Sequence, residues 1–312
     1  MTTVFGRYRN ALLFVSLACL WGGTYPAVKV GLADFPPILY AALRFDVAAV
    51  LLLVYAVNAF DYWRPRTVRD WVTVFAGGIL MLAGYSILLN IGQQTVSSAI
   101  AAILAGLIPL LTIGFARLLL PTERFGASEL FGVGLGFAGL VIITRPDPAN
   151  LFAADTFGQL LLVLAAASFA FGGVLTQWAS AEIPVAPRTA WAMAVGALFT
   201  HAVSVASPGE SLQQVHLSIE GVFALVYLAV FVSAVGYLLY FDLLSRLGSV
   251  ELNLVTYGAA MSGTVFSWAF FGERLTTGTL AGFLLILAGF VVLKRAEFYN
   301  EFTHVKERML AE

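Results

Sequence analysis

The sequence predicts an all-α integral membrane protein in which ten transmembrane helices form two inverted five-helix repeats. Of the 312 residues, 60% are hydrophobic and 11% are charged, whereas soluble domains carry about 25% charged residues. The apolar residues are grouped in blocks close to the roughly 20 residues that a helix needs to cross a bilayer. In addition, one sequence motif occurs twice, in similar copies 150 residues apart.

Apolar stretches separated by turn-forming residues define the expected helices. The breaks between them carry proline and glycine, as in DFPP at 34–37 and RPDPAN at 145–150, and these residues favour turns. The expected spans are Asn10–Gly31, Pro36–Val57, Trp71–Asn90, Val96–Leu118, Ala127–Thr144, Thr156–Ala179, Ala186–Ala206, Ile219–Phe241, Ser249–Phe271 and Thr277–Lys294.

The distribution of Lys and Arg predicts which side of the membrane each connection faces. If the N-terminus is cytoplasmic, thirteen of the 17 Lys and Arg residues fall at inner ends or in the C-terminal tail. Only Arg145 and Arg274 then fall outside, while Lys29 and Arg44 lie within spans. Because positively charged connections stay in the cytoplasm, we expect a multi-pass protein of the plasma or inner membrane with both termini cytoplasmic.

The repeated phrase is ERFGASELFGVGLGFAG at 123–139 and ERLTTGTLAGFLLILAG at 273–289. At the same shift of 150, Trp21-Gly22-Gly23 falls on Phe171-Gly172-Gly173, and Thr144-Arg145 falls on Lys294-Arg295. The pair Gly84-Tyr85 matches Gly236-Tyr237 at a shift of 152. The match therefore extends from the first helix of each half to the last, which indicates duplication of a five-helix unit.

This duplication predicts the domain organisation. The repeats occupy residues 1–150 and 151–297, and a charged cytoplasmic tail follows at 298–312. Because five is an odd number, the second copy enters the membrane inverted. Inverted repeats are common in secondary transporters, where the substrate site lies near the midplane between the halves.

Several motifs in this order and spacing resemble the drug/metabolite transporter superfamily, in its ten-helix EamA-type branch. The motifs are LWGGTYPAVK (20–29), ALRF (42–45), NIGQQTVSSA (90–99), Pro109, and the turns LPTERF and FGERL. The resemblance covers residues 10 to 297 and implies a secondary transporter, in most members an exporter of small metabolites such as amino acids. It also implies that helices 1–4 and 6–9 surround a central cavity, with helices 5 and 10 packed to the side. The chain departs from the family at Ala259 and Ala260, where second halves often carry a proline.

Lys29 is one of three charged residues within the expected spans that are candidates for a role in transport. Trp21, Tyr25 and Lys29 are spaced by four residues, so they share one helix face and could form a stripe that faces the substrate. Alternatively, Lys29 extends to the outer headgroups and Trp21 is a packing residue.

Arg44 and Asp46 are the other two charged candidates, and Tyr40 precedes Arg44 by one turn. A guanidinium can hold a carboxylate through two parallel bonds, so Arg44 and Lys29 favour a substrate with a carboxylate. Alternatively, Arg44 is structural. Asp46 and His201 are candidates for proton coupling, with hydrogen bonding between helices as the alternative for Asp46. At a shift of 150, none of Lys29, Arg44 and Asp46 recurs in the second half.

Uncharged polar and aromatic residues complete the expected substrate path. They suggest aromatic walls that suit amphiphilic or aromatic metabolites, although Tyr and Trp also populate the membrane interface. These candidates are Tyr85, Asn90, Gln93, Tyr237, Tyr240, Asn253, Tyr257 and Trp268. In the two turns, Glu123 and Glu273 are expected to be structural, because each carboxylate can accept from N–H groups at the start of the next helix.

What the sequence lacks narrows the function further. It has no phosphate-binding loop for ATP, no metal-ligand cluster and no visible pair of nucleophile and base. The basic residues follow the membrane topology and form no patch for nucleic acid. We therefore expect no cofactor, no metal and no enzyme activity, and as partners a small-molecule substrate and the lipid bilayer; a homodimer is compatible with these features. A channel or a non-transporting receptor remains the alternative, followed by an intramembrane enzyme.

Overall fold

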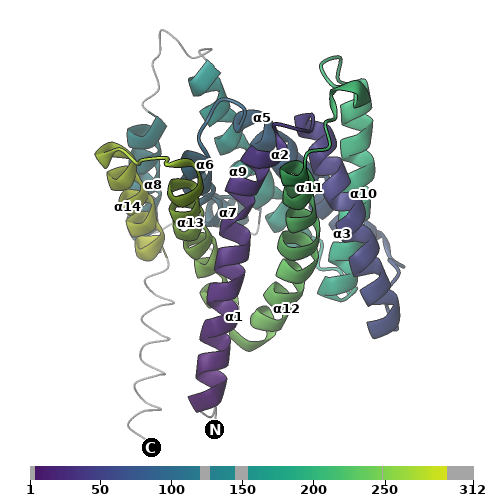
Figure 1. Cartoon of the computed structure of the whole chain (residues 1–312). Helices are drawn as coiled ribbons and strands as arrows, with labels where there is room; N and C mark the ends of the chain where they lie inside the picture. Colours follow the sequence, from purple (N-terminus) through teal and green to yellow (C-terminus); the bar gives the residue numbers. More distant parts are fainter. Residues whose placement is uncertain (1–3, 120–126, 145–153, 248, 294–312) are drawn as a thin grey trace, which may run out of the picture.

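The structure, a computed structural model, describes residues 4–119, 127–144, 154–247 and 249–293. Within these ranges the chain forms helices joined by short connections and contains no strand. Seven helical stretches of at least 18 residues are apolar enough to cross a membrane, and two shorter apolar helices accompany them. The chain is therefore an all-helical, multi-pass membrane protein, and most of its helices run along one common direction (Figure 1).

The elements of the first half differ from the expected spans mainly at two breaks. Pro26 and Pro109 have no N–H to donate, and the helices before them end at Gly22 and Ala105, the residues whose carbonyls lose this partner. The elements are α1 (Val4–Gly22), α2 (Thr24–Gly31), α3 (Pro37–Ala59), α4 (Val68–Phe75), η1 (Ala76–Gly84), α5 (Tyr85–Gly92), α6 (Ser98–Ala105), α7 (Ile108–Leu119) and α8 (Ala127–Thr144).

The second half has fewer interruptions. The helix that carries Ala259 and Ala260 runs without a break, which agrees with the absence of a proline there. The elements are α9 (Ala154–Trp178), α10 (Val185–Ala206), η2 (Leu212–Gln214), α11 (Ile219–Val226), η3 (Tyr227–Val235), α12 (Gly236–Leu247), α13 (Ser249–Phe271) and α14 (Thr277–Leu293).

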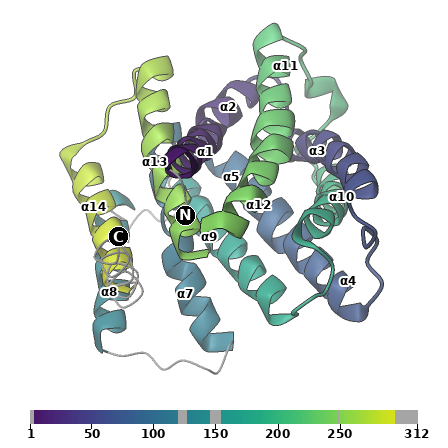
Figure 2. The same cartoon turned by 90° about the horizontal axis from the view of Figure 1, so that it is seen from below.

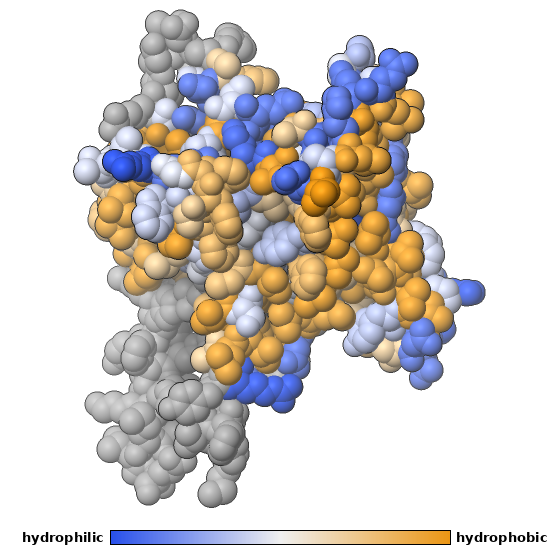
Figure 3. Space-filling view, in the orientation of Figure 1, coloured by the Kyte–Doolittle hydropathy of each residue, from blue (hydrophilic) through white to orange (hydrophobic). Residues whose placement is uncertain are grey.

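An apolar band crosses the visible face of the bundle. In Figure 3, apolar residues cover the middle of the visible face, and polar residues gather toward the two ends. Large apolar side chains that would be costly to expose to water lie on the surface of the bundle, including Val50, Leu198, Phe223 and Phe270. Such a surface suits the hydrocarbon core of a bilayer.

Two ends of the bundle can be distinguished by their connections. We name the end with residues 60–67 and 179–184 the inner end, after the predicted orientation; the amide of Ile183 donates to Asp70 there. The opposite, outer end holds residues 32–36 and 207–218, where the amide of His216 donates to the carbonyl of Asp34.

Two π-helical segments of nine residues occupy corresponding places in the halves. These are η1 (Ala76–Gly84) and η3 (Tyr227–Val235), and each leads into a helix whose first residues include a tyrosine, Tyr85 or Tyr237. The sequence predicted continuous α-helices here. A π-helix is wider than an α-helix and often occurs at functional sites.

The repeated phrase forms a contact between α8 and α14, which lie side by side at one edge of the bundle (Figure 2). A Cβ atom added to Gly139 would lie 2.5 Å from the carbonyl oxygen of Gly282, and one added to Gly289 would lie 2.5 Å from that of Gly132. The two contacts correspond under the repeat: a shift of 150 residues places Gly139 on Gly289 and Gly132 on Gly282. The two helices therefore approach so closely because glycines face each other at both positions.

Three carboxylates hold the start of a helix in the opposite half. Glu210 accepts from the amides of Ile38 and Leu39, Glu273 from those of Ser98 and Ala99, and Asp70 from that of Ile183. Such bonds satisfy N–H groups that have no partner within their own helix. Glu273 was expected to act on the helix that follows it, but it contacts α6 instead, and Glu123 lies outside the described residues.

Candidate functional site

A cavity of about 310 Å³ lies in the middle of the bundle, between the two halves. The first half contributes lining residues from α1 to α5 and α7, and the second half from α9, α10, η3, α12 and α13. Helices α8 and α14 contribute none. This arrangement agrees with the central cavity and the peripheral helix pair that the family resemblance implied.

The cavity occupies the middle and the inner half of the bundle. On α10 the lining residues run from Val185 to Ala192, the first two turns of a helix that ends at Ala206. On α9 they run from Phe169 to Gln177, close to its end at Trp178. No residue of the outer connections lines it.

Aromatic side chains form much of the wall. The ring of Trp21 stacks on Tyr240 with centroids 5.5 Å apart and lies 5.7 Å from Tyr237. On the other side, the hydroxyl groups of Tyr25 and Tyr85 are 3.5 Å apart. All five residues were expected on the substrate path, and all five line the cavity.

Arg44 extends from α3 into the cavity lining and is buried. Its Nε donates to Oγ of Ser233 in η3 at 2.9 Å, and its guanidinium lies 5.3 Å from the ring centre of Phe45. Tyr237 lies within electrostatic reach of Arg44. Arg44 therefore both joins the two halves and brings a positive charge to the cavity.

Arg188 is a second cation of the lining, and the sequence analysis did not select it. It occupies the first turn of α10, and Tyr240 lies within its electrostatic reach. Arginines are common at cytoplasmic helix ends, so the sequence did not indicate that Arg188 lines a cavity. Only the packing of α10 shows that this side chain borders the cavity.

Uncharged polar groups are distributed over the remaining lining. Most are hydroxyl groups, which can donate or accept hydrogen bonds. They are Thr24, Thr73, Ser86, Thr112, Thr176, Gln177, Thr189 and Thr256. The sequence analysis named none of them, because Ser and Thr are common in membrane helices and only the tertiary structure selects those that face inward.

Four other expected path residues lie outside the lining, toward the outer end. Lys29 donates to the carbonyl of Gln93, whose side chain in turn donates to the carbonyl of Tyr25. Asn90 donates to the carbonyl of Pro37, and Tyr40 donates to that of Ala27. These bonds tie α2, α3 and α5 together between the cavity and the outer end.

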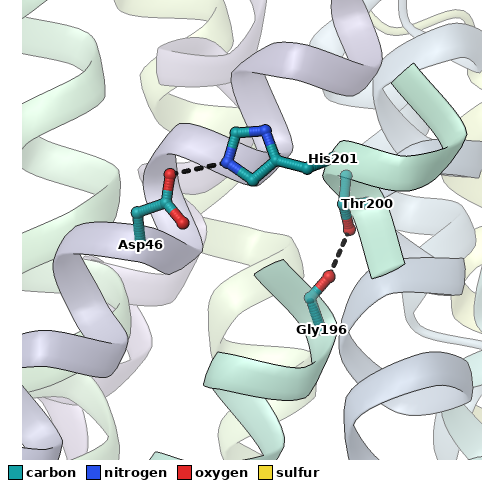
Figure 4. A network of polar contacts seen from close by, with 4 residues as sticks. All are labelled: Asp46, Gly196, Thr200 and His201. Atoms are coloured by element: carbon teal, nitrogen blue, oxygen red, sulfur yellow. Dashed lines mark hydrogen bonds and ion pairs between the residues drawn. The ribbon is translucent and has the colours of Figure 1, made fainter. Parts of the chain in front are cut away.

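Asp46 and His201 form a hydrogen bond between α3 and α10, with 2.8 Å between Oδ2 and Nε2 (Figure 4). Neither residue lines the cavity. Their side chains are 44% and 37% exposed on the flank of the bundle. Beside them, Thr200 donates to the carbonyl of Gly196 in its own helix. The pair thus joins the two halves from the lipid-facing side, and its part in proton coupling stays a prediction.

The last candidates lie on α13. Tyr257 packs against Phe290 of α14 and is buried in the core beside the cavity, and Trp268 is 61% exposed on the outside of the bundle. The side chain of Asn253 lies outside the described part of the chain. Over the residues that are described, no three His, Cys, Asp or Glu side chains are grouped as metal ligands would be.

Comparison with known proteins places these features in a family. The profile of the EamA-like transporter family matches residues 9–145 and 156–295. The uncharacterized transporter YoaV of Bacillus subtilis is 23% identical over 297 residues, covering 95% of this chain and 97% of the relative. The uncharacterized inner membrane transporter YedA of Escherichia coli K12 is 27% identical over 276 residues, covering 86% and 87%.

Similarity to a solved structure supports the fold. One protein crystal structure superimposes with a TM-score of 0.63 over 91% of this chain and 96% of the other, at 20% identity. Because the family profile matches most of the sequence in two stretches, the chain belongs to the EamA-like transporter family.

Proposed function

We propose that this chain is a secondary transporter that moves small metabolites across the plasma or inner membrane by alternating access. The observation that carries the proposal is the cavity of about 310 Å³ that residues of both halves line within the membrane-spanning bundle. Pockets for small ligands in proteins measure about 300–1,000 Å³. Transporters with inverted repeats bind substrates between the halves.

Three observations support ten spans arranged as inverted repeats. The two stretches that the family profile matches have nearly the bounds of the expected halves. The π-helical segments occupy corresponding places, and the glycine contacts of α8 and α14 exchange under the shift of 150 residues. The spans are the seven long apolar stretches together with α8, α13 and α14.

The described conformation fits an inward-facing state. The cavity reaches toward the inner end, whereas Lys29, Asn90 and Gln93 form bonds between the cavity and the outer end. Glu210 and Asp34 also join the halves there, the latter through Ser218. Alternating access requires these outer contacts to open while others form at the inner end.

The family resemblance supplies the direction and the general substrate class. It implies export of amino acids or related amphiphilic and aromatic compounds, and the stacked rings of Trp21, Tyr237 and Tyr240 offer a surface for such molecules. The distribution of Lys and Arg supports cytoplasmic termini. Labelling of a cysteine introduced in the 207–211 connection of intact cells, but not of one in 60–67, tests that orientation.

Counterflow in proteoliposomes tests the proposed function. We expect a panel of unlabelled metabolites, loaded inside, to accelerate uptake of a labelled one, because a carrier returns faster with substrate bound. A channel produces no counterflow, and a non-transporting receptor binds its ligand without flux. Chemical conversion of a panel member would instead indicate an intramembrane enzyme.

A further inference from the structure

We propose that the cavity selects substrates with a net negative charge over zwitterions and cations, and that Arg44 and Arg188 are the residues responsible. The proposal rests on the proposed transport function and names the substrate class of the same site. It is narrower than the carboxylate preference inferred from the sequence, because a zwitterionic amino acid also carries a carboxylate. It also assigns the second positive charge to Arg188 in place of Lys29.

The charges of the lining have one sign. Across the described residues, Arg44 and Arg188 are the charged side chains that line the cavity. No described carboxylate lies within ion-pair distance of either arginine; the described carboxylates that have a basic group within this distance are Asp242, beside Arg9, and Asp46, beside His201. The remaining lining consists of aromatic, aliphatic, hydroxyl and amide groups.

Two cations without acidic partners favour an anion in this position. Removing a charge from water is unfavourable unless an opposite charge or several hydrogen bonds compensate it. Ser233 accepts from Nε of Arg44 but, being a hydroxyl, leaves the positive charge uncompensated. A substrate carboxylate can accept two parallel bonds from a guanidinium and so supplies both the charge and the acceptors.

The cavity disfavours an ammonium group. None of the described lining residues is acidic, so an ammonium loses water without gaining a counter-ion, and it is repelled by both guanidinium groups. The ring of Trp21 can attract a cation, but it serves the ammonium of a zwitterion and a simple amine equally. We therefore expect the order anion, zwitterion, cation.

Arg44 and Arg188 lie at different depths in the bundle, and we assign them different roles in binding the anion. Arg44 lies in the lining between α3 and η3, where it is bonded to Ser233 of the other half. Arg188, in the first turn of α10, lies near the inner end. Tyr237 and Tyr240 stand between them, with ring centres 6.1 Å apart, near Arg44 and Arg188 respectively. Arg44 anchors the anion, and Arg188 attracts it from the inner end.

Ligands that share one aromatic body and differ in charge provide the test. The purified full-length chain in detergent is titrated with 3-phenylpropionate, phenylalanine and phenethylamine, and its thermal stabilisation is recorded. We expect 3-phenylpropionate to reach half of its maximal effect at a concentration at least ten-fold lower than phenylalanine, with phenethylamine weakest. Equal effects of the three compounds, the reverse order, or no effect of any would overturn the proposal.

Substitutions of Arg188 test whether this residue causes the preference for anionic ligands. Arg188→Gln should weaken the response to 3-phenylpropionate at least ten-fold, while Arg188→Lys, which keeps the charge, should retain most of it. Arg69→Gln removes an exposed positive charge from the same end of the bundle and should change the response less than two-fold. Equal losses in Arg188→Gln and Arg69→Gln would show that the overall charge, and not the cavity, is responsible.

Counterflow with the same three compounds separates this proposal from the proposed function. Binding of 3-phenylpropionate without counterflow would overturn transport and leave the anion site intact. Counterflow that prefers phenylalanine or phenethylamine would leave transport intact and overturn the selection of anions.

Discussion

Arg44 of α3 donates from Nε to Oγ of Ser233 in η3, at 2.9 Å. The two residues are 189 positions apart in the chain and belong to different halves. One side chain therefore brings a charge to the cavity and fixes a π-helical segment against the opposite repeat. A substrate that binds Arg44 can influence this contact directly, which is a requirement for coupling binding to the rearrangement of the halves.

Replacement of Ser233 by alanine tests the structural part of this contact. The substitution removes the acceptor and leaves the buried Nε of Arg44 without its partner, which should cost about 1–3 kcal/mol. Thermal unfolding in detergent measures the loss. Ser267→Ala is the matched control, because the buried Ser267 hydroxyl donates only within its own helix, to Gly263. Equal losses in the two variants would contradict a special role for the contact.

The glycine contact between α8 and α14 predicts the effect of a single methyl group. In Gly282→Ala the new Cβ would lie 2.6 Å from the carbonyl oxygen of Gly139, so the helices must separate, at a cost of about 1–3 kcal/mol. Gly134→Ala is the control, because no atom lies within 4 Å of a Cβ there. Thermal stability should fall in the first variant and stay within measurement error in the second. The response to ligands should persist in both, since neither glycine lines the cavity.

The carboxylates that hold helix starts across the halves predict a loss of stability when they are neutralised. Glu273→Gln weakens the bonds to the amides of Ser98 and Ala99, and the loss of such a cap costs about 0.5–2 kcal/mol. Glu182→Gln, at an exposed position of the inner end, should have little effect on the unfolding temperature. Indistinguishable unfolding temperatures for the two variants would show that the cap contributes nothing.

If the contact between Asp46 and His201 takes part in proton coupling, substitution of Asp46 should change the pH dependence of transport. If Asp46 exchanges a proton during the transport cycle, Asp46→Asn, which cannot ionise, should have a shifted pH profile of counterflow. Thr200→Ala, which alters a neighbouring bond within α10, should keep the profile of the unmodified chain. An unchanged profile in Asp46→Asn would leave the pair as a link between α3 and α10 only.

A substitution of Lys29 distinguishes the role in substrate binding suggested by the sequence from the position outside the cavity found in the structure. Its ammonium donates to the carbonyl of Gln93 toward the outer end and does not line the cavity. Lys29→Gln should therefore leave the half-saturating concentration of 3-phenylpropionate within about two-fold of the original value, in contrast to Arg188→Gln; a loss like that of Arg188→Gln would restore Lys29 to the substrate path.

The helical class, the membrane location and most helix bounds could be predicted because they depend on local composition. About 20 consecutive apolar residues have few alternatives to a membrane span. The expected spans ran through Pro26 and Pro109, whose missing N–H interrupts both helices in the structure. The π-helical segments could not be predicted, because Ala76–Gly84 and Tyr227–Val235 are ordinary apolar sequence. Both segments pack against helices of the other half, η1 against α9 and α10 and η3 against α3.

The sequence by itself was sufficient to recognise the family, to predict a five-helix repeat and to select the aromatic residues of the cavity, because these depend on composition and on motifs at fixed spacing. Only the tertiary structure decided which charges border the cavity. Lys29 and Arg44 were equal candidates in the sequence, and Arg188 resembled any inner arginine. The packing of the helices brings Arg44 and Arg188 to the cavity lining, with Arg44 held by Ser233. Lys29 lies on the same helix face as Trp21 and Tyr25 but farther toward the outer end, where it donates to the carbonyl of Gln93.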